Sequence, residues 1–282
     1  MYEQRISRKH PGCIIFLLDR SDSMKRPWEG NRTLAEGAAQ ALNDVLRELC
    51  IEGRKERGVV YHYFDIGIFG YGLRPIAGGE GVESAFGGNL TGYALAPLPE
   101  LNDNPIAVRE VPSIDLGGTT VMAPVWVEPI YGFRTPMCEA MAVAGQYAFD
   151  WAQSNTDSFP PVIINITDGW VTDEPLDGAS LPGWAQRLTS IETKDGHALL
   201  FNIFLSPDQG DQRMLPTTDS GLPDPGPQLF QISSALPQPM IANASGAGIP
   251  VEPGARGFAF NANLRMLSDF LKIGTNVGVH DI

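Results

Sequence analysis

Cysteine, positive charge and long apolar runs are all scarce in this sequence, and each shortage argues against a class of protein. The three cysteines, Cys13, Cys50 and Cys138, form no disulfide framework and lack the spacing of a metal site, so we expect them to be buried. Residues 1–12 are polar and basic, unlike a secretory signal, and no stretch has the length of a transmembrane helix. These features predict a cytoplasmic protein that does not bind membranes.

Basic and catalytic side chains are also few. The chain has 20 Lys and Arg against 33 Asp and Glu, a net charge of −13, which argues against nucleic-acid binding because that needs a concentrated positive surface. No Gly-x-Ser-x-Gly elbow of a serine hydrolase is present. No motif links a nucleophile to any of the four histidines, which are His10, His62, His197 and His280. We expect no catalytic histidine, and we expect His62, inside an apolar segment, to be a packed ring.

One stretch near the N-terminus combines an apolar run with oxygen-bearing side chains. Residues 14–18 are apolar without interruption, which is typical of a strand buried on both faces of a parallel sheet. Asp19, Ser21 and Ser23 then follow at alternate positions, at the carboxyl end of that strand, where open α/β sheets bind their ligands. One carboxylate and two hydroxyls are hard oxygen donors, which favour Mg²⁺ or Mn²⁺.

The remaining framework alternates between strand and helix patterns. Thr33 and Glu36 form a capping-box pattern ahead of a helix with a buried face over residues 34–49. The further predicted elements are strands over 59–72, 162–166, 198–205 and 258–260 and helices over 137–151, 184–191, 229–236 and 264–271. Residues 206–228 and 237–257 are expected to be irregular. This alternation predicts an α/β fold, a doubly wound, mostly parallel Rossmann-like sheet flanked by helices.

Residues 73–131 break this rhythm. The segment contains Gly-Gly pairs, several prolines, short apolar pieces and a net acidic charge. We expect an insertion of loops and short antiparallel strands within a single domain that covers residues 1–282. Long connections of this kind within compact domains tend to be functional or disordered.

Two later motifs add oxygen donors to the same edge of the predicted sheet. Thr135 precedes Pro136, which suits a first helical position, and Asp168 follows the strand over 162–166 in a Thr-Asp-Gly sequence. Each motif alone has an ordinary explanation, since Thr135 can cap the helix and Thr-Asp-Gly is a common turn. The Gly-Gly-Thr-Thr sequence at 117–120 is a rival for the threonine position, but the helix that follows Pro136 favours Thr135.

Taken together, the three motifs resemble the metal-ion-dependent adhesion site of von Willebrand factor A domains, over roughly residues 10–72, 130–205 and the closing helix. The resemblance implies that Ser21, Ser23 and Thr135 contact Mg²⁺, with Mn²⁺ or Ca²⁺ as substitutes, and that Asp19 and Asp168 neutralise it partly through water. It also implies an intracellular, bacterial type of domain in which an Asp or Glu of a partner protein completes the metal coordination. Intracellular members resemble adaptors for AAA+ ATPases, or components of stress clusters of the tellurium-resistance type with kinases and phosphatases.

Two other functions, a structural scaffold and a phosphotransferase, are alternatives to this one. A structural scaffold subunit could have its site closed in cis by an acidic residue of the insertion, namely Glu80, Glu83 or Glu128. A Mg²⁺-dependent phosphotransferase of the haloacid dehalogenase type also places an aspartate after a first buried strand, but it needs Asp-x-Asp, and Ser21 stands at the second position. The sequence therefore predicts a binding module and not an enzyme.

Overall fold

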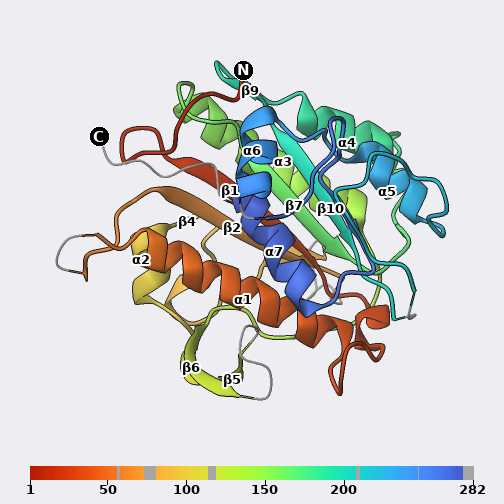
Figure 1. Cartoon of the computed structure of the whole chain (residues 1–282), viewed down its shortest axis with the longest axis horizontal. Coiled ribbons are helices and arrows are strands. Elements are labelled where there is room, and N and C mark those ends of the chain that lie inside the picture. Colours follow the sequence, from red (N-terminus) through yellow and green to blue (C-terminus); the bar gives the residue numbers. More distant parts are fainter. Residues whose placement is uncertain (56–57, 73–80, 114–118, 208–209, 247, 276–282) are drawn as a thin grey trace.

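A computed structural model of the chain is organised around one eight-stranded sheet (Figure 1). The structure describes residues 1–55, 58–72, 81–113, 119–207, 210–246 and 248–275. The strand order is β11-β12-β10-β7-β1-β2-β3, and β4 pairs with β2 beside β3. The strands of this sheet are β1 (Gly12–Asp19), β2 (Phe64–Tyr71), β3 (Val82–Ser84), β4 (Ala96–Pro97), β7 (Val162–Thr167), β10 (Leu199–Phe204), β11 (Arg213–Met214) and β12 (Phe258–Phe260).

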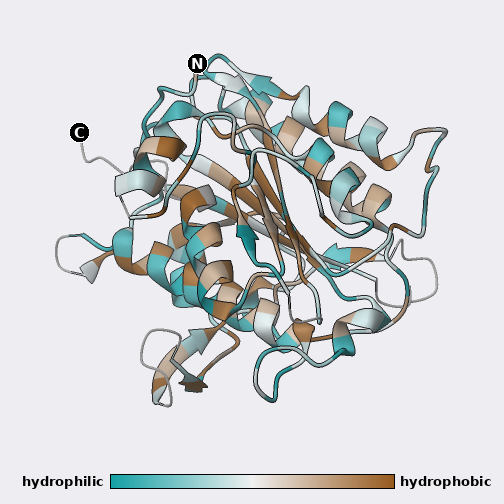
Figure 2. Ribbon diagram, turned by 45° about the vertical axis from the view of Figure 1, so that its right-hand side comes forward, coloured by the Kyte–Doolittle hydropathy of each residue, from teal (hydrophilic) through white to brown (hydrophobic). Residues whose placement is uncertain are grey.

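The centre of the sheet is parallel and its edges are antiparallel. β12, β10, β7, β1 and β2 all run in the same direction, whereas β11, β3 and β4 run against their neighbours. All eight residues of β1 and all six of β7 are buried, as expected for strands covered by helices on both faces. Figure 2 shows these central strands as the apolar interior of the molecule. The doubly wound, mostly parallel α/β fold is confirmed.

Helices cover both faces of the sheet. One apolar cluster packs α1, α2, α6 and α7 on one face, and a second packs α3, α4 and α5 on the other (Figure 1). The helices are α1 (Leu34–Glu52), α2 (Leu98–Asp103), α3 (Met137–Ser154), α4 (Leu181–Thr189), α5 (Gly226–Ile232), α6 (Gln238–Gly246) and α7 (Leu264–Thr275). The predicted capping box of α1 is present, since Thr33 Oγ1 accepts from Glu36 N and Glu36 Oε2 accepts from Thr33 N. Within the described part of the chain, no helix is long and apolar enough to cross a membrane.

Several segments differ from the pattern that the sequence predicts. Residues 206–228, predicted to be irregular, contain β11 and the start of α5, and the helices predicted over 184–191 and 229–236 are α4 and α5, each of which begins three residues earlier. The strand predicted over 59–72 begins only at Phe64, which pairs with Gly12, the first residue of β1, and Val60 forms only an isolated bridge with Arg54. The segment 237–257, predicted to be irregular, contains α6. Only Met240 and Ala244 of α6 are buried, so its apolar periodicity is too sparse to be recognised.

His62 is not the packed ring that the sequence predicts. It lies just before β2, its ring is 44% exposed, and Nε2 lies 2.7 Å from Asp65 Oδ1. Trp151 Nε1 donates to the other oxygen of the same carboxylate at 2.8 Å. The hydrogen bond to Asp65 raises the pKa of His62 above its ordinary value of 6.5.

The insertion predicted over 73–131 contributes short antiparallel strands, as expected, and also helix α2. β3 and β4 extend the main sheet, whereas β5 (Ala107–Pro112) and β6 (Thr120–Val125) form a separate hairpin (Figure 1). This hairpin lies against α1, where Gln40 Nε2 donates to Pro112 O at 2.8 Å. Residues 73–80 and 114–118 lie outside the described part. The small remaining elements are η1 (Asp22–Lys25), η3 (Gly88–Leu90), β8 (Glu192–Thr193) and β9 (Gly196–His197).

The strand order places a topological switch point between β1 and β7. From β1 the chain continues to β2 on one side, and the later strands β7, β10 and β12 extend the sheet on the other side. Connections therefore leave β1 and β7 in opposite directions, which opens a crevice at their carboxyl ends. Asp19 is the last residue of β1, and Asp168 directly follows β7. The fold thus brings both predicted carboxylates to the edge where doubly wound sheets bind ligands.

Candidate metal site at the ends of β1 and β7

Asp19 is held rigidly at the end of β1. Its Oδ1 accepts a hydrogen bond from Ser21 N at 2.8 Å, and its Oδ2 accepts one from Thr167 Oγ1 at 2.6 Å. The residue is buried, and burial together with the nearby charge of Asp168 raises the pKa of Asp19 to about 7. Two carboxylates therefore lie close enough in the interior to repel each other, and a cation would relieve that repulsion.

Two hydroxyls and the second carboxylate form a chain of short contacts beside Asp19. Ser21 Oγ lies 3.0 Å from Ser23 Oγ, and Ser23 Oγ donates to Asp168 Oδ1 at 2.8 Å. Mg²⁺ holds six oxygens at about 2.1 Å in an octahedron, which sets neighbouring ligand oxygens about 3 Å apart. Ca²⁺, with oxygens at about 2.4 Å, needs wider spacing. The two contacts here are hydrogen bonds of similar length, and the donor types are the hard oxygens that Mg²⁺ and Mn²⁺ prefer.

Thr135 belongs to the segment that precedes α3, and this segment runs beside the one that carries Ser21. Phe133 forms a parallel bridge with Ser21, so Thr135 and Ser23 lie two residues further along neighbouring segments. On its other side, Thr135 N donates to Thr172 Oγ1 at 2.9 Å, and Thr172 N donates to Thr135 O at 3.0 Å. Thr135 is thereby fastened between the Ser21 segment and the loop after β7.

The hydroxyl of Thr135 is not needed to cap α3, contrary to the ordinary explanation of this residue. α3 begins at Met137, as predicted, with Pro136 as its N-cap and not as its first helical residue. The capping acceptor is Asp173, whose carboxylate accepts from Cys138 N at 3.1 Å and from Glu139 N at 2.8 Å. Because Asp173, in the loop after β7, accepts these hydrogen bonds, the side chain of Thr135 is not needed to cap α3.

Arg26 is a third charged group at the site, one that the sequence did not predict. Its Nη2 donates to Asp168 Oδ2 at 2.7 Å and lies 3.4 Å from Asp168 O, and its Nε donates to Ser23 O at 3.3 Å. The Asp168 side chain is fully buried, whereas the Arg26 side chain is 43% exposed. The guanidinium thus neutralises one oxygen of Asp168 from the solvent side and leaves Oδ1 toward Ser23.

The acidic residues proposed to close the site from the insertion are engaged elsewhere where the structure describes them. Glu83 Oε1 lies 3.6 Å from Nη1 of the buried Arg20. Glu128 receives two hydrogen bonds from Arg109, at 3.1 and 2.7 Å. Glu80 lies outside the described residues. Among the residues described, no group of three His, Cys, Asp or Glu side chains could hold a metal ion, so the hydroxyls are essential to the candidate site.

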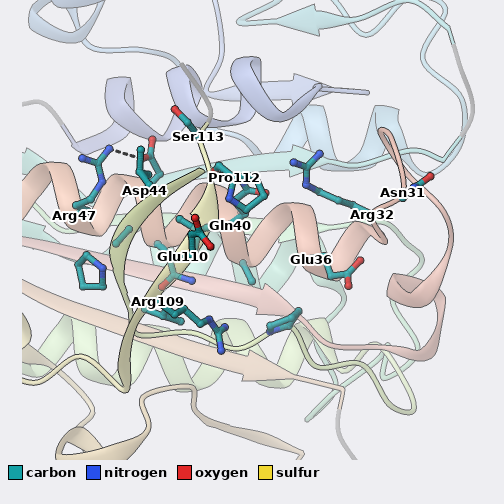
Figure 3. A pocket seen from close by; sticks show the side chains of 18 residues that line it. Asn31, Arg32, Glu36, Gln40, Asp44, Arg47, Arg109, Glu110, Pro112 and Ser113 are labelled. Atoms are coloured by element: carbon teal, nitrogen blue, oxygen red, sulfur yellow. Dashed lines mark hydrogen bonds and ion pairs between the residues drawn. The ribbon is translucent and has the colours of Figure 1, made fainter. Parts of the chain in front are cut away.

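A cavity of about 540 Å³ lies elsewhere, between α1 and the β5–β6 hairpin (Figure 3). Its floor is formed by alanine, valine and proline side chains, and charged groups surround it. Arg47 Nη2 donates to Asp44 Oδ1 at 2.6 Å, and Glu110 Oε1 accepts from Thr120 Oγ1 at 2.5 Å. Thr119 directly precedes β6 and Thr120 is its first residue, so the described part of the rival threonine motif belongs to the hairpin and not to the edge of β1 and β7.

The cysteines are free and buried, as predicted. Burial raises the pKa of Cys13 well above its ordinary value, and it raises the pKa of both Cys50 and Cys138 to about 12. A thiol with such a pKa carries almost no thiolate at neutral pH, and thiolate is the form that reacts or binds metal. The cysteines are therefore part of the packed interior.

No family model matches the sequence, and no curated protein matches it significantly. Three solved structures are similar in shape at low identity. Proximal thread matrix protein 1 from the mussel byssus is 16% identical with a TM-score of 0.48, over 97% of this chain and 49% of that one. The pilus adhesin SpaC from Lactobacillus rhamnosus GG is 11% identical with a TM-score of 0.48, over 95% of this chain and 30% of the adhesin. The manganese-loaded TRAP protein of Plasmodium vivax is 14% identical with a TM-score of 0.37, over 94% of this chain and 74% of the TRAP chain.

This chain spans about half of the mussel protein and less than a third of the pilus adhesin. With TM-scores below 0.5, these likenesses assign neither the fold nor a function, and the fold is assigned from the strand order alone.

Proposed function

We propose that this chain is a von Willebrand factor A-like interaction module that binds a partner protein through a divalent cation and carries out no catalysis itself. The observation that carries the proposal is the convergence of Ser21, Ser23 and Asp168 with oxygen spacings of 3.0 and 2.8 Å at the switch point of the sheet. In this proposal Ser21, Ser23 and Thr135 hold Mg²⁺ or Mn²⁺, and Asp19 and Asp168 balance its charge. When bound, the cation supplies an electrophilic position for an outside carboxylate.

The contacts of the two carboxylates support binding in preference to phosphoryl transfer. Asp19 uses both oxygens as hydrogen-bond acceptors, from Ser21 N and Thr167 Oγ1, which leaves it poorly placed as a nucleophile. The position of the second acid in a haloacid dehalogenase site is taken by Ser21, whose hydroxyl points to Ser23. The carboxylate of an Asp or Glu on the partner is the ligand that a cation with few charged ligands attracts. An adaptor role in an AAA+ or kinase–phosphatase system follows from the resemblance alone.

The alternative is a structural scaffold whose site is closed by an acidic residue of the same chain. Of the three proposed residues, Glu83 and Glu128 contact Arg20 and Arg109, respectively. Closing the site with either one would break an ion pair, which weighs against this alternative.

The test is a calorimetric titration of EDTA-treated protein with Mn²⁺ and Mg²⁺. We expect saturable 1:1 binding by the natural chain and binding at least roughly ten-fold weaker in Asp19→Asn and Asp168→Asn. Asp44→Asn is the matched control, because it removes a carboxylate that is also largely buried but pairs with Arg47 near the cavity. Folded protein that binds neither metal would contradict the proposal, and so would an equal loss of binding in Asp44→Asn.

A further inference from the structure

The exposed Arg26 occupies an unusual position for a basic residue, in direct contact with a carboxylate proposed to balance a divalent cation. Its Nη2 lies 2.7 Å from Asp168 Oδ2, while Asp168 Oδ1 accepts from Ser23 at 2.8 Å. Asp168 thus contacts the guanidinium through Oδ2 and faces the hydroxyls of the candidate metal site through Oδ1. A cation at the hydroxyls and the guanidinium would share Asp168 and repel each other.

The backbone around Arg26 holds it at this point. Arg26 N donates to Ser23 O at 3.0 Å, directly after η1, and Leu34 N donates to Arg26 O at 3.1 Å at the start of α1. The buried side chain of Met24 anchors the same turn. The guanidinium is therefore placed by the segment that carries Ser21 and Ser23, and its exposed part faces the solvent, from which a partner would approach.

A guanidinium has five N–H donors in a planar fork that matches the geometry of a carboxylate. The described contacts use Nε and Nη2 for Ser23 and Asp168. An acidic side chain that reaches the cation would also come within range of this positive charge. The Arg26 guanidinium would then weaken the binding of the metal alone and strengthen the binding of the metal together with an acidic ligand.

From these contacts we infer that Arg26 couples the two ligands of the site and determines its specificity for a carboxylate. Its charge weakens the binding of a divalent cation alone and strengthens the binding of an acidic side chain to the loaded site. By thermodynamic reciprocity, the acidic ligand then tightens the metal by the same factor. The inference rests on the proposed function, and it adds a reason why the site would hold metal firmly only when the partner is present.

The experiment measures Mn²⁺ affinity by calorimetry or electron paramagnetic resonance, with and without the peptide Ac-Gly-Asp-Gly-NH₂ as a carboxylate probe. We expect Arg26→Gln to bind Mn²⁺ alone roughly ten-fold more tightly than the natural chain and to lose most of the tightening caused by the peptide. Arg26→Lys keeps the charge, so it should keep the weaker binding of Mn²⁺ alone, but it should lose part of the tightening caused by the peptide because an ammonium lacks the planar fork. The peptide with Asn in place of Asp should have no effect on any variant.

Lys25→Gln is the matched control, because it makes the same change in net charge one residue away. Lys25 pairs with Asp22 at 2.7 Å on the surface and does not contact Asp168. It should leave both affinities unchanged, and thermal unfolding of each variant checks that the fold is intact. If Arg26→Gln binds Mn²⁺ alone more tightly than the natural chain, and the peptide tightens binding mainly in the natural chain, the inference is supported.

Two results would overturn the inference, and they differ from each other. If the natural chain binds Mn²⁺ but Arg26→Gln binds it no more tightly and responds equally to the peptide, Arg26 does not couple the ligands. If neither protein binds Mn²⁺ with or without the peptide, the proposed metal site itself is wrong and the inference falls with it.

Discussion

Carboxylates gather at two places in this molecule, and their surroundings differ. Beside the cavity between α1 and the β5–β6 hairpin, Asp44 pairs with Arg47 (Figure 3), and Glu110 accepts a hydrogen bond from Thr120. At the edge of β1 and β7, two buried carboxylates share one site with hydroxyls, and the pKa of Asp19 is raised to about 7. Beside the cavity one guanidinium faces one carboxylate, whereas at the strand ends the single guanidinium of Arg26 faces two buried carboxylates, and this excess of negative charge favours a cation.

The two regions also begin their helices differently. α1, beside the cavity, is capped locally by Thr33 and Glu36. α3, beside the candidate metal site, is capped by Asp173, which belongs to the loop after β7. A local cap stabilises only its own helix, whereas the long-range cap also fastens together two segments that carry site residues.

The largest difference between the two regions should appear when hydroxyls are removed. The double variant Ser21→Ala, Ser23→Ala deletes two proposed ligands, so we expect Mn²⁺ affinity to fall by roughly 100-fold or more. Thr120→Ala removes a hydroxyl that donates to Glu110 on the hairpin and should leave Mn²⁺ affinity unchanged. Calorimetric titration of both variants measures this. Equal Mn²⁺ affinities in the double variant and in Thr120→Ala would show that the hydroxyls at the strand ends do not bind the metal.

A smaller effect should follow from removal of each helix cap. Asp173→Ala and Thr33→Ala should each lower the free energy of unfolding by about 1 kcal/mol, because backbone donors lose their acceptor. Only Asp173→Ala should also weaken Mn²⁺ binding, by a few-fold, since Thr135 is held against the loop that carries Asp173. Urea unfolding and Mn²⁺ titration of the pair separate the two roles. Unchanged Mn²⁺ affinity in Asp173→Ala would show that this cap serves stability alone.

The smallest effect concerns Asp65, a carboxylate outside both regions that has His62 as its partner. The pKa of His62 is raised in the folded protein, so the pair stabilises fully below pH 6.5 and this contribution is lost as the pH rises through the folded-state value. Because the ring is 44% exposed, His62→Gln should cost less than about 1 kcal/mol at pH 6 and nothing at pH 9. Chemical unfolding at the two pH values measures this, and a loss that is equal at both would argue against protonation of His62.

Much of the framework could be predicted because burial leaves a local pattern. The unbroken apolar runs of β1 and β7 end in Asp19 and Thr167-Asp168, and parallel strands of one sheet bring such ends to a common edge. The capping box of α1 lies within four consecutive residues and is equally readable. The strand ends made it possible to predict Asp19, Ser21, Ser23 and Asp168 as candidate site residues.

The remaining features depend on contacts between distant parts of the chain. Nothing near Asp173 in sequence indicates that it caps a helix that begins at Met137, and nothing near Arg26 indicates that it contacts Asp168. The start of β2 is set by its partner β1, and α6 buries too few apolar residues to show a period. Thr167 could have been found, since it directly precedes Asp168 in the motif.

Crystals soaked with Mn²⁺ would test the central claim most directly, because anomalous scattering locates the ion without assumptions about its ligands. The account predicts a single strong peak about 2.1 Å from Ser21 Oγ and Ser23 Oγ, beside Asp168 and Thr135 at the ends of β1 and β7. A peak among the carboxylates of the cavity, or none at the strand ends under saturating Mn²⁺, would contradict it.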